Sequence, residues 1–367
     1  MQISVCMKHF VYILFLVVCL VSCNGHSKHW EVLTQVESYI EERPDTALVT
    51  LEQIDLSELS GKEEKAKYAL LYSMALDKNF IDKTSFEVLQ PAIDYYEDNG
   101  SVTDKLRTYY YQGRIYQNMS NDALAMESFV NAIAVSHESD DVLTMARIYF
   151  AQSKIYYSLY EWDNSIECLR KAATLYKEAG IHHYYADCLI LIISGYTIKD
   201  DYENALLYID KCKQISETMS VSSLSQFYSV YLTYLIKCGT EEEINHIIDE
   251  YINSISTSYI DWLTITNAYI SIERYNEALH AISHYKNDPR ITASLKYKAL
   301  ISKIYEKLDR YDESLRAYKE FMVVSDSTNY AIMRQDTKFV EERHSLELQT
   351  LKERESKIRV MLWSALS

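Results

Sequence analysis

A spacing pattern that recurs every 40 residues constrains this chain more than any other feature. In the first clear copy, the small residue Gly113 is followed by Tyr116 and then by Ala125, Phe129 and Ala132. A shift of 40 residues gives Ser153, Tyr156, Ser165, Leu169 and Ala172, and a further 40 gives Ile193, Tyr196, Ala205, Ile209 and Cys212. Later copies follow at shorter intervals: a degraded copy with Leu232, Leu235, Ile244 and Ile248, then Thr266, Tyr269, Ala278 and Ile282, and last Ser302, Tyr305, Ser314 and Tyr318. Such a period predicts an array of stacked units.

Within each unit, the spacing predicts a helix, a short turn and a second helix packed against the first. The small residue at Gly113 or Ser153 lets the two helix backbones approach, and the tyrosine three residues later fills the space beside it. Composition favours helices as well, since the 367 residues include only seven glycines and three prolines. β-Turns and glycine-rich loops depend on these residues. We therefore expect an all-α fold.

The pattern resembles the tetratricopeptide repeat (TPR), whose motif places an aromatic residue, a small residue and a tyrosine before Ala, Phe and Ala. The resemblance covers residues 103–324. Apolar residues with helical periodicity predict two more helix pairs at 29–54 and 64–96. The resemblance implies a right-handed α-solenoid of about eight antiparallel pairs, which we expect over residues 23–326 without a linker. Helix ends are expected at Gly61, Gly100, Gly180 and Gly239.

The N-terminus predicts an export signal. Lys8 precedes an apolar run from Phe10 to Val21, which is too short for a membrane span of about 20 residues. The following Ser22-Cys23 resembles the end of a bacterial lipobox. That resemblance implies a signal peptide at 1–22, acylation of Cys23 and a lipid-anchored, mainly periplasmic location in the bacterial envelope. The alternatives are an uncleaved anchor or a buried first helix.

The C-terminal part predicts a long charged helix at 327–359, in which Ile332, Phe339 and Leu346 recur at intervals of seven. Such a helix either caps the array or forms a weak homodimer seam. One interpretation of the apolar end at 360–367 is a truncated transmembrane segment. This order of segments is similar to bacterial regulators in which a transmembrane helix leads to a helix-turn-helix domain. The truncated sensory half of such a regulator is therefore an alternative function.

Charge and motifs narrow the function further. A formal charge of −16 disfavours nucleic acid, whose phosphates require Lys and Arg. The chain contains no HExxH, GxSxG, GxGxxG or P-loop motif. Ser283 and Lys286 match SxxK without its companion motifs. The remaining candidates for metal ligands, which we interpret as exposed helix residues, are His182, His183, His246, Asp249 and Glu250. We expect no catalytic residue, metal or cofactor.

Four cysteines follow the predicted signal peptide and its lipidated Cys23, at Cys168, Cys188, Cys212 and Cys238, and none forms a CxxC pair. Buried cysteines act as small apolar residues, so we expect them in the helical core. Cys188 and Cys212 would face each other across one helix hairpin, which leaves a disulfide between them open.

The first helices of successive repeats are expected to line a ligand groove. The TPR resemblance places nine residues there: Arg107, Tyr110, Arg114, Gln117, Asn118, Arg147, Phe150, Lys154 and Tyr157. Four of these nine are cationic, which suits an extended peptide with acidic groups. Arg114 and Arg147 are the expected anion anchors, with Tyr110 and Tyr157 as flat contacts. The alternative is that these cations pair with acidic residues of neighbouring helices.

The predicted function is a non-enzymatic, membrane-anchored scaffold that binds a peptide or protein of unknown identity, with an acidic partner as one option. A nutrient-binding lipoprotein is a weaker reading, since the chain lacks long loops rich in Gly, Pro and Trp.

Acylation of Cys23 is directly testable. Metabolic labelling with a fatty-acid analogue should mark the wild-type protein and should fail with Cys23→Ala, because the thiol is the expected attachment point. Cys238→Ala serves as the control and should be labelled normally. Label retained by Cys23→Ala would contradict the lipoprotein prediction.

Overall fold

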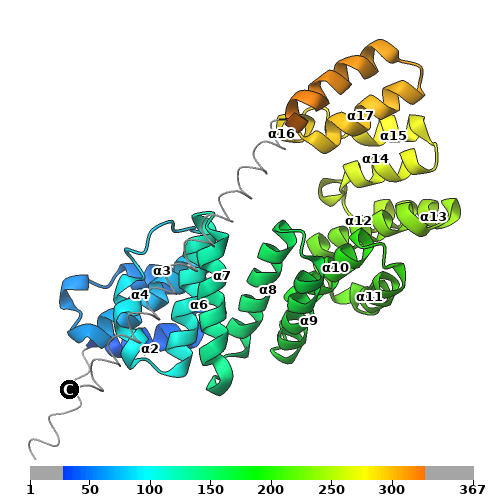
Figure 1. Cartoon of the computed structure of the whole chain (residues 1–367). Coiled ribbons are helices and arrows are strands. Elements are labelled where there is room, and N and C mark those ends of the chain that lie inside the picture. The colour runs from blue at the N-terminus through cyan, green and yellow to red at the C-terminus, as the bar shows by residue number, and fades with distance from the viewer. Residues whose placement is uncertain (1–27, 327–367) are drawn as a thin grey trace, which may run out of the picture. The chain divides into compact units, whose positions relative to one another are not determined.

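The computed structural model describes residues 28–326, all of whose regular elements are helices (Figure 1). The predicted signal peptide, Cys23, the charged tail at 327–359 and the apolar end at 360–367 lie outside the described residues. The chain divides between Ser139 and Asp140 into two compact units. The sequence, which has no linker at this point, did not indicate that division.

The first unit contains three helix pairs. They are α2 (Lys28–Tyr39) with α3 (Pro44–Glu52), α4 (Gly61–Lys78) with α5 (Gln90–Asn99), and α6 (Val102–Asn118) with α7 (Asp122–Val135). Short 3₁₀ helices follow α3 at Leu56–Glu58 (η1) and α7 at Ser136–Glu138 (η2). The two pairs predicted upstream of the clear repeats are therefore present.

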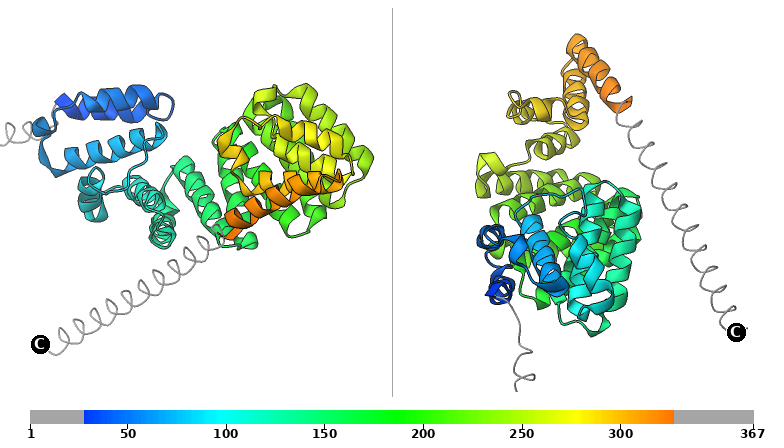
Figure 2. Two further views of the ribbon diagram at one scale, coloured as in Figure 1. Left: turned by 90° about the horizontal axis from the view of Figure 1, so that it is seen from above. Right: turned by 90° about the vertical axis from the view of Figure 1, so that its left-hand side faces the viewer.

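The second unit contains five pairs, which can be followed in two further views (Figure 2). They are α8 (Val142–Ser158) with α9 (Trp162–Glu178), α10 (His182–Ile198) with α11 (Tyr202–Ile215), α12 (Val221–Cys238) with α13 (Glu241–Ser254), α14 (Trp262–Ser271) with α15 (Tyr275–Ser283), and α17 (Leu295–Lys307) with helical residues 311–326. Short helices lie at Ser216–Thr218 (η3), Thr257–Tyr259 (η4) and Pro289–Thr292 (α16). The prediction of an all-α fold of about eight antiparallel pairs is confirmed.

The small residues of the motif lie where the two helices of a pair touch. A Cβ atom on Gly113 would stand 2.4 Å from Cε1 of Phe129 on α7. In the next pair, the Ser165 hydroxyl donates to the Ser153 carbonyl at 2.9 Å. Ser302 and Ser314, which have the same separation of 12 residues, exchange such hydrogen bonds at 3.1 and 3.0 Å. The predicted register of the repeat is therefore correct at these three pairs.

The turns inside the pairs use residues that the sequence did not single out. Positive φ angles of 57–62° occur at Phe80, Ser120, Tyr160, Asp200, Glu273 and Asp309. At five of these turns the next residue donates its N–H to the carbonyl of the motif tyrosine, as Asn121 does to Tyr116 at 2.9 Å and Asp201 to Tyr196 at 3.0 Å. After Phe80, Ile81 donates to the carbonyl of Leu76 at 3.0 Å in the same way. This is the left-handed closure of a helix end.

Of the four glycines expected at helix ends, Gly180 alone closes a helix with a positive φ, of 72°. Gly61 has a positive φ but begins α4. Gly100 and Gly239 follow α5 and α12 in extended conformations with negative φ. At both, an added Cβ would collide with the preceding helix, 2.8 Å from Tyr96 and 2.7 Å from Leu235. Both are nonetheless the C-cap residues of their helices and donate their N–H groups to the carbonyls of Tyr96 and Leu235, so the expected helix ends are confirmed, with close packing as the reason for glycine.

Three of the four described cysteines lie in the core of the second unit. Cys168, Cys188 and Cys212 are buried and free, whereas Cys238 is free and exposed. Burial raises the pKa of the Cys168 thiol to about 11 and that of Cys212 to about 12. Cys188 and Cys212 thus act as small core residues and are not joined. Within residues 28–326, no helix is long and apolar enough to cross a bilayer.

Gly113→Ala tests the close approach of α6 and α7. On an open helix surface this change stabilises by about 0.5–1 kcal/mol, but here the methyl group meets the Phe129 ring. We expect a loss of about 1–3 kcal/mol in the free energy of unfolding, measured by denaturant titration. The loss should shrink when Gly113→Ala is made in a Phe129→Leu background. A stabilising effect in the wild-type background would show that the two helices do not touch at Gly113.

Candidate functional site

In the first unit, the predicted groove arginines are paired with acidic residues of earlier helices. Arg107 on α6 donates to Glu37 of α2 at 2.9 Å, and Lys67 of α4 donates to the other carboxylate oxygen at 2.6 Å. Arg114 donates to Asp77 of α4 at 3.1 Å and to Gln117 at 3.0 Å. For these two arginines, the structure favours the alternative of internal ion pairing.

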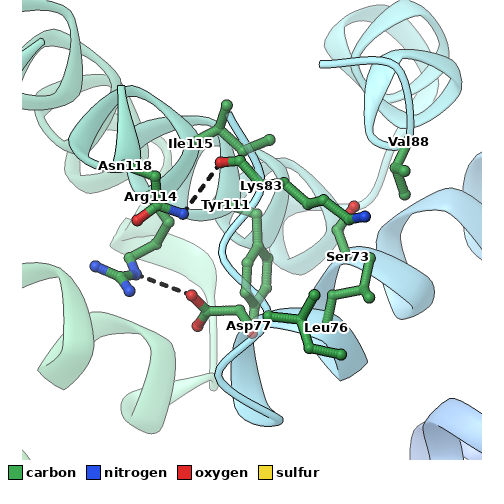
Figure 3. A pocket seen from close by; sticks show the side chains of 10 residues that line it. Ser73, Leu76, Asp77, Lys83, Val88, Tyr111, Arg114, Ile115 and Asn118 are labelled. Carbon is green, nitrogen blue, oxygen red and sulfur yellow. Dashed lines mark hydrogen bonds and ion pairs between the residues drawn. The ribbon is translucent and has the colours of Figure 1, made fainter. Parts of the chain in front are cut away.

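The Arg114–Asp77 pair borders a small hollow between α4 and α6 (Figure 3). On its rim, Asn118 donates to the Lys83 carbonyl at 3.1 Å. Burial by itself lowers the pKa of Arg114, but the charge of Asp77 and the hydrogen bond to it raise that pKa above the ordinary value. Arg114 therefore keeps its charge and is held in place by α4.

Tyr110 does not offer its ring to a ligand, and the prediction of a flat contact at this residue was wrong. Its side chain is only 6% exposed, with its ring 4.8 Å from Tyr111 and 6.2 Å from Phe129. Since Gly113 has no side chain, Phe129 occupies the space beside it and Tyr110 packs onto Phe129. The inward position of Tyr110 thus follows from the close approach of α6 and α7 at Gly113.

In the second unit, three predicted residues on α8 lie at the surface or near it. The Lys154 ammonium stands 4.7 Å from the centre of the Phe150 ring. Phe150 in turn lies 6.3 Å from Tyr176 and 6.4 Å from Tyr184, measured between ring centres. Tyr157 is 42% exposed and meets Trp162 edge to face at 4.9 Å. The fourth, Arg147, is partly buried and has an interaction partner of its own.

Asp187 on α10 is a site residue that was not predicted. It accepts a hydrogen bond from Ser223 of α12 at 2.9 Å. Burial raises the pKa of Asp187 above its usual value, and the Ser223 hydrogen bond and the charges of His183 and Lys154 oppose this in part. The 40-residue period could have found this residue, because one step from Arg147 leads to Asp187.

Residues 28–326 hold no group of three or more His, Cys, Asp or Glu side chains placed to bind a metal ion. The His246 and Glu250 side chains lie 3.9 Å apart on one face of α13. Ser283 of the SxxK match donates its hydroxyl to the carbonyl of His280 at 2.6 Å, which is an ordinary helix contact. His182 and His183 are exposed in the first turn of α10.

No family model and no curated protein sequence matches this chain. Solved structures do resemble it. The apo form of RapI matches with a TM-score of 0.60 and 15% identity, over 85% of this chain and 92% of RapI. A Rap protein complexed with Competence and Sporulation Factor gives 0.53 and 14%, over 84% and 100% of the two chains. NprR in complex with its cognate peptide NprX gives 0.50 and 16%, over 83% and 100%. At this identity the likeness shows a shared TPR-type helical fold.

Asp187→Asn tests whether the partly buried carboxylate of Asp187 lowers the free energy of unfolding. Because the pKa is higher in the folded state than in the unfolded one, the folded state binds more protons between the two values, and stability falls as the pH rises through that window. The asparagine variant should lack this fall, so its free energy of unfolding at pH 7 should equal or exceed that of wild type.

Glu243→Gln is the control, because the pKa of Glu243 is shifted in the opposite direction to that of Asp187. The backbone N–H and hydroxyl of Thr240 lower the pKa of Glu243, so its stabilising contribution is lost as the pH falls through the folded-state pKa. Denaturant titrations between pH 3 and pH 8 measure both effects. A clear loss of stability at pH 7 in Asp187→Asn would assign Asp187 a structural role.

Proposed function

We propose that this chain is a non-enzymatic scaffold, anchored to a bacterial envelope membrane through Cys23, that binds an extended peptide or protein segment on its first helices. The observation that carries the proposal is a polar row across α8, α10 and α12 of the second unit. Ser223 bonds Asp187, and the charge of Lys154 acts on the same carboxylate. One row of polar groups thus crosses three successive repeats, with Lys154 and Asp187 as its ligand-facing members and the buried Ser223 holding Asp187 in place.

The chemistry of this row fits a polypeptide. Lys154 lies over the Phe150 ring and is exposed, so it can meet a carboxylate of the ligand. Asp187 can accept an N–H from a peptide backbone or an amino group. Phe150 and Tyr184 supply an aromatic surface beside both groups. The ligand expected from this row carries both signs of charge, which modifies the acidic peptide suggested by the arginines alone.

The structural neighbours support the choice of ligand class. NprR was solved with its cognate peptide NprX, and a Rap protein with Competence and Sporulation Factor. Proteins with a similar fold therefore bind NprX or Competence and Sporulation Factor. Their contacts are not transferred to this chain, because the sequences are 14–16% identical.

The proposed anchor would keep the scaffold near the membrane surface. Helix α2 begins at Lys28, five residues after Cys23. Attachment of two or more acyl chains would make the anchoring stable where one chain is marginal. Partners recognised by the scaffold would then be other envelope proteins or peptides that reach that surface.

Site-specific photo-crosslinking in living cells tests the binding surface. A photo-reactive amino acid in place of Tyr157 on α8 should capture a partner, because this exposed side chain lies one helical turn after Lys154 of the polar row. The matched control is Leu206, an equally exposed residue on α11, where no adduct of the same mass is expected. With the captured partner, Lys154→Ala should weaken binding about tenfold. Equal capture at both positions, with affinity unchanged in Lys154→Ala, would move the site away from the first helices.

A further inference from the structure

A second hollow lies among α11, α12 and α13, and its lining shares no residue with the polar row. Its empty space is about 670 Å³, part of it open to solvent. Two second helices, α11 and α13, form its walls, and α12 contributes the floor between them. About 310 Å³ of this space is room that a ligand could fill, which is at the lower end of the range of small-ligand sites.

The wall formed by α11 is cationic. The Lys213 ammonium donates to the Tyr231 hydroxyl at 3.1 Å and stands 4.8 Å from the centre of that ring. Asp210 is 3.9 Å away, beyond a normal hydrogen bond. An ammonium group has three N–H donors, so Lys213 can still bind an anionic group in the hollow while Tyr231 holds it in place.

The opposite wall, formed by α13, is anionic. One carboxylate oxygen of Glu250 accepts a hydrogen bond from the Tyr228 hydroxyl at 2.9 Å. The other carboxylate oxygen is 3.9 Å from Nε2 of His246. That distance is too long for a hydrogen bond, which leaves this oxygen able to accept from a cationic ligand group.

Aromatic rings of α12 form the floor between these walls. Phe227 and Tyr231 are stacked with ring centres 5.8 Å apart, and Tyr228 stacks on Tyr251 at 5.1 Å. Each wall charge is thus tied to its own floor tyrosine, Lys213 to Tyr231 and Glu250 to Tyr228. The two tyrosines hold opposite charges apart on either side of an apolar surface.

We propose that this hollow binds a peptide segment in which an acidic and a basic side chain flank an apolar one. The acidic side chain would meet Lys213, the basic one Glu250, and the apolar one the partly exposed ring of Tyr231, which stacks on the buried Phe227. Charge complementarity sets the order of the three groups along the ligand. The hollow is lined by none of Lys154, Asp187 and Ser223, so binding at either site can be lost without the other.

A charge exchange tests the order directly. Random nine-residue peptides displayed on phage are selected on the full-length wild type and on a variant that carries Lys213→Glu with Glu250→Lys. The control exchange, Lys211→Glu with Glu242→Lys, lies on the same two helices outside the lining of the hollow and keeps the same net charge. Circular dichroism establishes that all three proteins are folded.

The wild type and the control should enrich peptides with the three groups in one order, and the exchanged variant should enrich the reverse order. A peptide selected on wild type should lose at least tenfold in affinity for the exchanged variant and keep its affinity for the control. If the exchanged variant does not fold, Lys213→Gln and Glu250→Gln replace it, and each should remove the preference for one charge.

Two results would overturn the assignment. One is enrichment of the same peptides by all three proteins, or no peptide that separates wild type from the exchanged variant. The other is a homodimer, detected by sedimentation, that the exchange dissolves and the control preserves, because the hollow would then belong to a second copy of this chain.

Discussion

Close contact between the two helix backbones of each pair is the constraint on which the rest of this structure depends. At Ser153 and Ser165 the contact is a hydrogen bond from a side chain to the facing backbone, and at Gly113 it is an aromatic ring laid on bare backbone. Contacts this short fix how closely the two helices of these pairs approach each other. Equivalent side chains of successive first helices consequently fall in rows, as Asp187 and Ser223 do.

The fold was predictable because the repeat spacing is kept from copy to copy and places small residues such as Gly113, Ser153 and Ser302 at this contact. The turns were not, since they place Phe80 and Tyr160 in a left-handed conformation that bulky side chains avoid. Packing of the paired helices overrides the local preference there, and the carbonyls of Leu76 and of the motif residue Tyr156 close the two turns. Glycine therefore marks helix ends at Gly100, Gly180 and Gly239, but none of the described left-handed turns inside the pairs.

The candidate site was predictable only where its residues face solvent. Lys154 and Tyr157 could be placed from the motif, whereas the acidic partners of Arg107 and Arg114 lie on helices 70 and 37 residues earlier. A single sequence does not show such pairings, because they depend on how one pair stacks on the next. The hollow beside Lys213 was hidden for the same reason, since second helices that contribute to it come from different repeats.

The buried thiols of the second unit have a practical consequence. Cys168, Cys188 and Cys212 are enclosed by the core and protonated at neutral pH, and Cys238 is the one exposed thiol in the described range. Alkylating reagents act on thiolates they can reach, so modification of the three buried groups must wait for their repeats to open. The rate at which each thiol is alkylated therefore reports how often its own part of the core opens, so these cysteines are natural probes of local unfolding.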